Sequence, residues 1–185
     1  MPSRWLNRRG DQTEVAVAEK VKVLFVCLGN ICRSPTAHGV FAGLVKSQGL
    51  EKQILVNSAG TSGWHIGQRP DARSVAAARE RGIDLSRLRG SQVKLKDFQV
   101  YDYILAMDKK NLADLKALAP DDFDGCLELL LNFDPLAGLN EVPDPYYGAR
   151  DGFERVIAMI ESASSALLEH IQTRDLGYDQ SQGSR

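Results

Sequence analysis

The sequence predicts an α/β protein, a single domain built on a parallel β-sheet with helices on both faces. Short apolar segments rich in β-branched residues alternate along the chain with segments of helical periodicity. Such alternation implies right-handed crossovers between parallel strands. The 185 residues contain no internal repeat or low-complexity block, and a chain of this length can bury a sizeable core without disulfides.

The first predicted strand and the first predicted helix flank a polar loop. Residues 23–26 form a continuous apolar run, which is typical of a strand buried on both faces. The loop Cys27-Leu-Gly-Asn-Ile-Cys-Arg33 follows it. Ser34 and Pro35 then form a helix-start signal, with Ser34 as the N-cap and Pro35 in the first helical position. Apolar residues at helical spacing extend this helix over residues 36–46.

The remaining elements continue the alternation of strands and helices. Gly82, at the end of the second predicted helix, is a favourable C-terminal stop. Asp108 is a candidate N-cap for the third helix, and the last helix is long and amphipathic. The expected strands are residues 53–59, 102–107 and 127–133, and the expected helices are residues 69–81, 109–118 and 149–171.

These elements place one domain at residues 21–173, with a polar segment at each end. Residues 1–20 contain three arginines and show no clear period, which favours a flexible N-terminal arm over a transit or docking segment. Residues 174–185 are predicted to be a polar, frayed tail.

Charge balance and cysteine content exclude several classes of protein. The chain has 23 basic and 24 acidic residues, so it carries no basic footprint for nucleic acid or a membrane surface. Three cysteines do not make a disulfide framework, and they suit a reducing cytoplasm. The sequence shows neither a membrane-spanning segment nor a secretory signal before the first strand. The histidines and Cys126 lack metal-ligand spacing, so no metal is expected. Cys126 lies at the edge of a predicted apolar strand, so it is predicted to be buried and inert.

The strand, loop and helix start around residues 27–33 are suited to binding an oxyanion. Backbone N–H groups at a helix N-terminus attract anions, and the planar guanidinium of Arg33 matches two phosphate oxygens. Cys27 shares this positive field, so we expect its thiol to be ionised and nucleophilic. A nucleophile and an oxyanion site in one loop imply attack on phosphate and a covalent intermediate. The loop is not a nucleotide loop, because the terminal Lys-Ser/Thr pair is missing.

The segment Cys27-Leu-Gly-Asn-Ile-Cys-Arg-Ser-Pro35 closely resembles the signature of the low-molecular-weight protein tyrosine phosphatases. The resemblance extends to Asp144-Pro-Tyr-Tyr147 and, more loosely, to residues 21–171. It implies the four-stranded parallel sheet of that family, of the phosphotyrosine protein phosphatase I type. It also implies cofactor-free hydrolysis of phosphotyrosine and small aryl phosphates through a cysteinyl phosphate. The expected partner is a phosphotyrosine-containing protein, with a tyrosine kinase as one candidate.

Asp144 is the candidate for the acid and base chemistry. One carboxyl group can protonate the leaving phenolate and then activate water, and the prolines on either side of Asp144 restrict its backbone. By itself an Asp-Pro pair is usually a turn, and it is the resemblance that assigns Asp144 a catalytic role. The resemblance also places Tyr146, Tyr147 and Trp64 at the rim of the pocket. Aromatic walls there favour phosphotyrosine over the shorter phosphoserine.

Several loop residues have more specific expected roles. Asn30 is expected to adopt a left-handed conformation, with Ser58 as a candidate partner. Ser34 is expected to cap the helix, and the resemblance implies that its hydroxyl also binds the nucleophile sulfur. Cys32 is either a small buried residue or a resolving thiol that forms a reversible disulfide with oxidised Cys27, and we favour the redox role. Cys27 and Arg33 are the catalytic residues of the loop, and the expected substrate-binding residues are Leu28, Gly29, Asn30, Ile31, Cys32 and Ser34.

The chain departs from the family pattern at His38 and Leu88. Many members carry an acidic residue at the first position and a histidine at the second, and this pair supports the loop. Here the histidine lies on the first predicted helix instead. His38 is therefore either a supporting residue or an ordinary surface histidine, and the pH optimum stays open.

Three alternative functions compete with tyrosine phosphatase activity. Arsenate reductases of similar fold need further cysteines, and beyond the loop pair this chain has only Cys126. Arginine phosphatases carry Thr where Ile31 stands and lack the paired tyrosines. A silent phosphate-binding module should have lost the nucleophile or the acid, and both are present. A tyrosine phosphatase is therefore the favoured prediction, as a monomer or weak dimer, with its physiological substrate left open.

Overall fold

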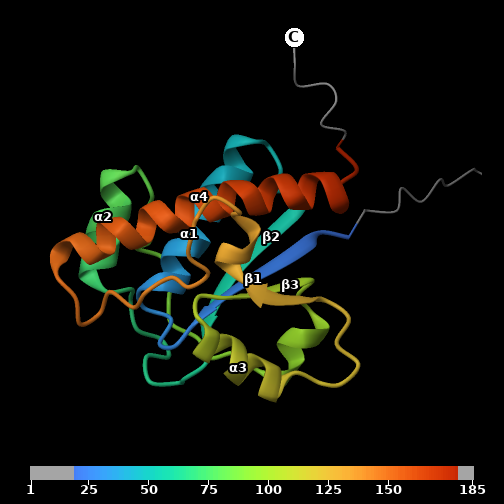
Figure 1. The fold of residues 1–185 in the computed structure, drawn as a ribbon, viewed down its shortest axis with the longest axis horizontal. Coiled ribbons are helices and arrows are strands. Elements are labelled where there is room, and N and C mark those ends of the chain that lie inside the picture. The colour runs from blue at the N-terminus through green and yellow to red at the C-terminus, as the bar shows by residue number, and fades with distance from the viewer. Residues whose placement is uncertain (1–18, 179–185) are drawn as a thin grey trace, which may run out of the picture.

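Alternating strand and helix segments fold into the predicted four-stranded parallel sheet, and the structure places its strands in the order β2-β1-β3-β4 (Figure 1). The computed structural model describes residues 19–178. Residues 1–18 and 179–185 lie outside the described residues, so the N-terminal arm and the polar tail stay predictions. The strands are β1 (Val21–Cys27), β2 (Ile54–Gly60), β3 (Tyr103–Ala106) and β4 (Cys126–Leu129). The helices are α1 (Arg33–Ser47), α2 (Ala72–Glu80), α3 (Lys109–Leu118) and α4 (Arg150–Arg174), with short 3-10 helices η1 (Leu95–Gln99) and η2 (Leu130–Phe133).

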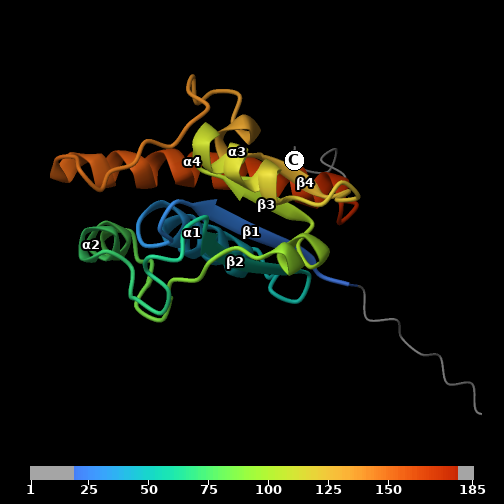
Figure 2. The ribbon, with the colours of Figure 1, turned by 90° about the horizontal axis from the view of Figure 1, so that it is seen from below.

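Alternate residues of the central strand β1 face opposite layers of the core. Val23 and Phe25 pack with residues of α1, α2 and α4, whereas Leu24 and Val26 pack with residues of α3 and η1. Because helices cover both faces, the whole apolar run of β1 is buried, as its pattern predicts. Figure 1 shows α1 and α4 on one side of the strands and α3 on the other. Figure 2 shows α4 running along the length of the domain.

The start of α1 differs from the prediction. Its N-cap is Cys32 rather than Ser34, and no side chain caps the helix. Ser34 lies inside the first turn, where its Oγ donates a hydrogen bond to the Ala59 carbonyl at 3.2 Å. The side chain therefore does not satisfy the N–H groups at the start of α1, which remain suited to binding an anion.

The fourth strand is shorter than predicted. β4 ends at Leu129, and residues 130–133 form the 3-10 helix η2 instead of continuing the strand. The neighbouring strand β3 ends at Ala106, which pairs with Leu129. The sheet therefore offers residues 130–133 no strand to pair with, although Leu130 and Leu131 are still buried.

Helix α2 begins at Ala72, later than the predicted residue 69. Its N-cap is Asp71, whose carboxylate accepts a hydrogen bond from the backbone N–H of Arg73 at 2.8 Å. Gly82 follows the end of the helix with φ of 74°, so it acts as the predicted stop. Within residues 19–178, no helix is long and apolar enough to cross a membrane.

Candidate active site

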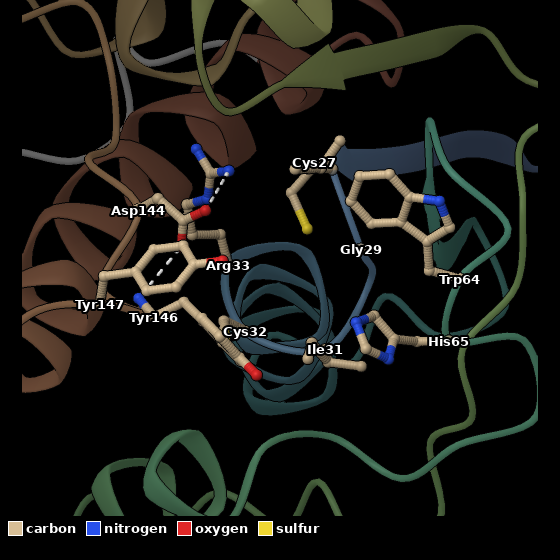
Figure 3. Close-up of a pocket in the computed structure, with 11 residues that line it drawn as sticks. Cys27, Gly29, Ile31, Cys32, Arg33, Trp64, His65, Asp144, Tyr146 and Tyr147 are labelled. Atoms are coloured by element: carbon tan, nitrogen blue, oxygen red, sulfur yellow. Dashed lines mark hydrogen bonds and ion pairs between the residues drawn. The ribbon is translucent and has the colours of Figure 1, made fainter.

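The site lies at the carboxyl end of β1, the edge at which open α/β sheets bind ligands. Side chains from three distant parts of the chain line one pocket there (Figure 3). We call residues 27–33 the nucleophile loop and residues 143–147 the acid loop. The lining residues are Cys27, Leu28, Gly29, Ile31, Cys32, Arg33, Trp64, His65, Asp144, Tyr146 and Tyr147.

The sulfur of Cys27 lies at the base of the nucleophile loop. The side chain is buried, with 3% of its surface exposed. Its Sγ accepts a hydrogen bond from the backbone N–H of Asn30 at 3.3 Å and lies 3.0 Å from Oγ of Ser34. The Ser34 hydroxyl is within reach of both this sulfur and the Ala59 carbonyl, so it can donate to Sγ once the thiol is ionised. This geometry matches the contact that the family resemblance implies for Ser34.

Asn30 adopts the left-handed conformation that was predicted, with φ of 55°. Its predicted partner was wrong. The amide Nδ2 donates to Oγ of Ser34 at 2.8 Å, and Oδ1 accepts from the backbone N–H of Ser91 at 2.9 Å, so neither bond involves Ser58. Ser58 lies one step further out, where its carbonyl accepts from Oγ of Ser91 at 3.1 Å and its Oγ lies 3.2 Å from Nδ1 of His38.

His38 is therefore a partly buried residue and not a surface histidine. It contacts Ser58, which is linked through Ser91 to Asn30 of the nucleophile loop. Burial lowers the pKa of His38 from 6.5 to about 4, so its imidazole is neutral at ordinary pH. Leu88, the other departing position, packs against the main core cluster.

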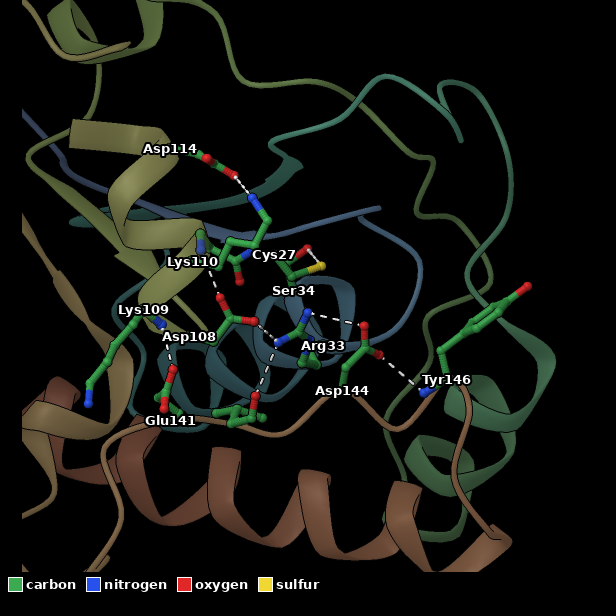
Figure 4. A network of polar contacts seen from close by, with 12 residues as sticks. Cys27, Arg33, Ser34, Asp108, Lys109, Lys110, Asp114, Glu141, Asp144 and Tyr146 are labelled. Carbon is green, nitrogen blue, oxygen red and sulfur yellow. Dashed lines mark hydrogen bonds and ion pairs between the residues drawn. The ribbon is translucent and has the colours of Figure 1, made fainter. Parts of the chain in front are cut away.

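Arg33 is buried and held by acceptors from two later segments (Figure 4). Its Nη1 donates to Oδ2 of Asp108 at 2.5 Å and to the carbonyl of Val142 at 3.1 Å. Its Nη2 lies 3.4 Å from Oδ2 of Asp144. Burial opposes the charge of Arg33, but Cys27 and the two carboxylates outweigh this, so the pKa of Arg33 is raised and the guanidinium stays charged.

Asp108 has a second contact that the sequence reasoning missed. As predicted it caps α3, accepting from the N–H of Asn111 at 2.7 Å. Its other oxygen pairs with Arg33, so one carboxylate both caps a helix and orients the guanidinium of Arg33. The position of Asp108 two residues after the end of β3 was the available signal, because parallel strands end at the same edge of the sheet.

The acid loop brings Asp144 to the pocket from the opposite end of the domain sequence. The Asp144 side chain is 39% exposed, and its Oδ1 accepts from the backbone N–H of Tyr146 at 3.1 Å. The rings of Tyr146 and Tyr147 meet edge to face with centroids 4.9 Å apart. Tyr147 and Trp64 stand at the rim with 92% and 71% of their surface exposed. His65 also lines the pocket and was not predicted, although it directly follows Trp64.

Of the three cysteines, two lie in the nucleophile loop and all three are free. Cys32 is buried, and burial together with the negative charge of Asp71 raises the pKa of its thiol to about 12. Cys126 opens β4 and is only half-buried, so the prediction that it is buried was wrong. Among the described residues, no group of three or more His, Cys, Asp or Glu side chains is arranged to hold a metal.

Comparison with known proteins agrees with the fold and the pocket. A family model described as low molecular weight phosphotyrosine protein phosphatase matches residues 22–176. The low molecular weight protein-tyrosine-phosphatase of Streptomyces coelicolor is 42% identical over 154 residues, covering 82% of this chain and 93% of the relative. The crystal structure of YfkJ from Bacillus subtilis has a TM-score of 0.80 and 39% identity, over 85% of this chain and 98% of that one. A Drosophila arginine phosphatase structure has a TM-score of 0.78 and 31% identity, over 84% and 100%. The chain therefore belongs to the low molecular weight phosphotyrosine protein phosphatase family.

Proposed function

We propose that this phosphatase hydrolyses phosphotyrosine in proteins, with Cys27 as nucleophile, Arg33 as oxyanion ligand and Asp144 as general acid and base. The observation that carries the proposal is the shared pocket: three residues with these chemical capacities line it together, although Asp144 comes from a distant segment. A carboxyl group across the pocket from a thiol is the arrangement that two-step phosphate transfer requires.

In the first step the Cys27 thiolate attacks phosphorus. An S–P bond forms while the bond from phosphorus to the tyrosine oxygen breaks, and protonated Asp144 donates its proton to the departing phenolate. The loop amides and Arg33 bind the phosphate oxygens, where charge accumulates. The contact of 3.4 Å between Arg33 and Asp144 is longer than a strong charge-assisted hydrogen bond, so we expect a phosphate oxygen to displace the carboxylate from Nη2.

In the second step a water molecule hydrolyses the cysteinyl phosphate. Asp144, now a carboxylate, takes a proton from water as its oxygen attacks phosphorus. The S–P bond breaks, inorganic phosphate forms, and Cys27 leaves as a thiolate. Ser34, whose Oγ lies 3.0 Å from the sulfur, stabilises that thiolate by donating a hydrogen bond.

The pocket rim supports phosphotyrosine as the substrate class. Cys27 is buried whereas Trp64 and Tyr147 are largely exposed, so a phosphate must pass aromatic walls to reach the sulfur. A tyrosine ring spans that depth and stacks on those walls, and phosphoserine is too short to do so. Phosphoarginine is the second candidate, because an arginine phosphatase is among the similar folds. Ile31 argues against it, since it lines the pocket where the family resemblance expects Thr in arginine phosphatases.

Cys32 supports a proposed redox role. Peroxide would oxidise the Cys27 thiolate to a sulfenic acid, and attack by Cys32 would then release water and form a disulfide that thiols can reduce. Both cysteines line the pocket, which is the observation that supports the pairing. Burial raises the pKa of Cys32 to about 12, so its thiol is protonated and must lose that proton as the disulfide forms. The free thiols favour the reducing cytoplasm as the place of action. The proposed partner is a phosphotyrosine protein, such as a tyrosine kinase. The proposed oligomeric state is a monomer or weak dimer.

The test is a matched assay on phosphotyrosine, phosphoserine and phosphoarginine versions of one peptide, with wild type and Cys27→Ser. We expect release of phosphate from the phosphotyrosine peptide by wild type and none by the variant. Preferred turnover of the phosphoarginine peptide would establish the second candidate. Activity retained by Cys27→Ser would refute the proposed nucleophile.

A further inference from the structure

The acid loop has few hydrogen bonds to the rest of the domain. Across residues 19–178, no backbone-to-backbone hydrogen bond joins residues 143–147 to a distant segment, and the Pro145 carbonyl accepts only from Gly148, three residues later. One hydrogen bond reaches this backbone from another element of the described chain. It runs from Nη1 of Arg73, on α2, to the carbonyl of Tyr146 at 3.1 Å.

The other side of the Arg73 guanidinium is fixed to the helix cap of α2. Its Nε and Nη2 donate to the two carboxylate oxygens of Asp71 at 3.0 and 2.8 Å, which is a bidentate pair. These bonds are the main reason that the pKa of Asp71 is lowered. Asp71 is in turn attached to the nucleophile loop, because its backbone N–H donates to the Ile31 carbonyl at 2.8 Å.

Two aromatic rings complete the surroundings of Arg73. Its guanidinium carbon lies 5.3 Å from the centroid of Tyr146 and 4.6 Å from that of Phe153, both within cation–π range. Phe153 is buried at the start of α4, so it is a fixed platform for the guanidinium. Arg73 therefore holds the backbone and the ring of Tyr146 while it is itself held by Asp71 and Phe153.

Tyr146 passes this restraint to the general acid. Its backbone N–H donates to Oδ1 of Asp144 at 3.1 Å, so Tyr146 restrains one oxygen of that carboxyl group while Arg33 lies 3.4 Å from the other. From these contacts we propose that Arg73 is a positioning residue that ties the acid loop to the nucleophile loop and aims Asp144 at the leaving group. Arg73 does not line the pocket, so it acts through Tyr146 and Asp144 and not on the substrate. The inference rests on the proposed role of Asp144.

The proposal predicts a loss that depends on the leaving group. Arg73→Met should lower kcat/KM for phenyl phosphate about 10- to 100-fold, because a shift of about 1 Å in a catalytic group can cost that much. The loss for p-nitrophenyl phosphate should stay below about 3-fold, because its phenolate leaves readily without a proton. Inhibition by inorganic phosphate should be unchanged, since it reports binding in the nucleophile loop. Arg73→Lys keeps the cation but lacks the fork, so its kcat/KM should be intermediate.

Two further variants make the test specific. Arg81→Met is the matched control, because Arg81 joins α2 to Glu154 and Glu161 of α4 away from the pocket, and it should show wild-type kcat/KM for both substrates. In an Asp144→Asn background, Arg73→Met should add no further loss, because the group that it positions is gone.

The outcomes separate this inference from the function on which it rests. Equal losses for both substrates, additive losses in the double variant, or weaker phosphate inhibition would each overturn the role of Arg73. A leaving-group-dependent loss in Asp144→Asn without one in Arg73→Met would refute the inference alone. No leaving-group dependence in Asp144→Asn would refute the proposed general acid itself.

Discussion

Replacing His38 should make this protein lose less stability when the pH is lowered into the mildly acidic range. Burial lowers the pKa of His38 from 6.5 to about 4 in the folded state. Well above pH 6.5 the imidazole is neutral in both states and adds no pH dependence. Between pH 6.5 and about 4 the unfolded chain binds a proton that the folded protein excludes, so the stability of the folded state falls as the pH falls.

The size of the effect follows from that difference in pKa. One pKa unit is worth about 1.4 kcal/mol. Lowering the pKa of His38 from 6.5 to about 4 therefore corresponds to about 3 kcal/mol of unfolding free energy at the acid end of the window. The assay is urea unfolding followed by circular dichroism, for wild type and His38→Asn, from about pH 7.5 to about pH 4. The asparagine amide can still reach Ser58, so the variant removes the titrating ring with little other change to the contact.

Wild type should lose about 2 to 3 kcal/mol more than His38→Asn across this window. Identical pH profiles for wild type and His38→Asn would refute the claim that His38 is held neutral by burial.

Three further predictions concern the core and the nucleophile loop. Asp108→Asn should cost about 2 kcal/mol in urea unfolding, because Arg33 loses a partly buried ion pair; an unchanged midpoint would contradict this. Cys32→Ser should regain less activity than wild type when thiol is added after peroxide, and equal recovery would rule out a resolving thiol. Gly39→Ala should lower thermal stability by about 1–3 kcal/mol, because its Cβ would lie 2.3 Å from Cδ2 of Leu85; an unchanged Tm would show that Leu85 can move aside.

The parts of the fold that were predicted correctly are those that depend on a few neighbouring residues in the sequence. The apolar run of β1, the cap of α3 at Asp108 and the left-handed Asn30 each follow from a few adjacent residues. The start of α1 was wrong because Ser34 also follows the N-cap rule, while its hydroxyl takes a contact across the sheet to Ala59. Local rules cannot weigh such a contact against a cap.

The missed parts of the site depend on segments that meet only in the folded chain. Ser91 reaches Asn30 because its segment pairs with the end of β2, where Gly60 and Gln92 form an isolated bridge. The contacts of Arg73 with the acid loop and of Arg33 with Asp108 likewise join residues far apart in sequence. No spacing rule within one segment encodes these pairs, so they required the three-dimensional arrangement.

The central claim is that Cys27 carries phosphate covalently during turnover. The most direct measurement is rapid acid quenching of the enzyme with an aryl phosphate, followed by mass spectrometry of the peptide that contains Cys27. Wild type and the control Cys126→Ser, at a half-buried cysteine outside the pocket, should both show transient phosphate on Cys27, and Cys27→Ser should show no phosphate and no turnover. Turnover by Cys27→Ser, or phosphate on any other residue, would contradict the account.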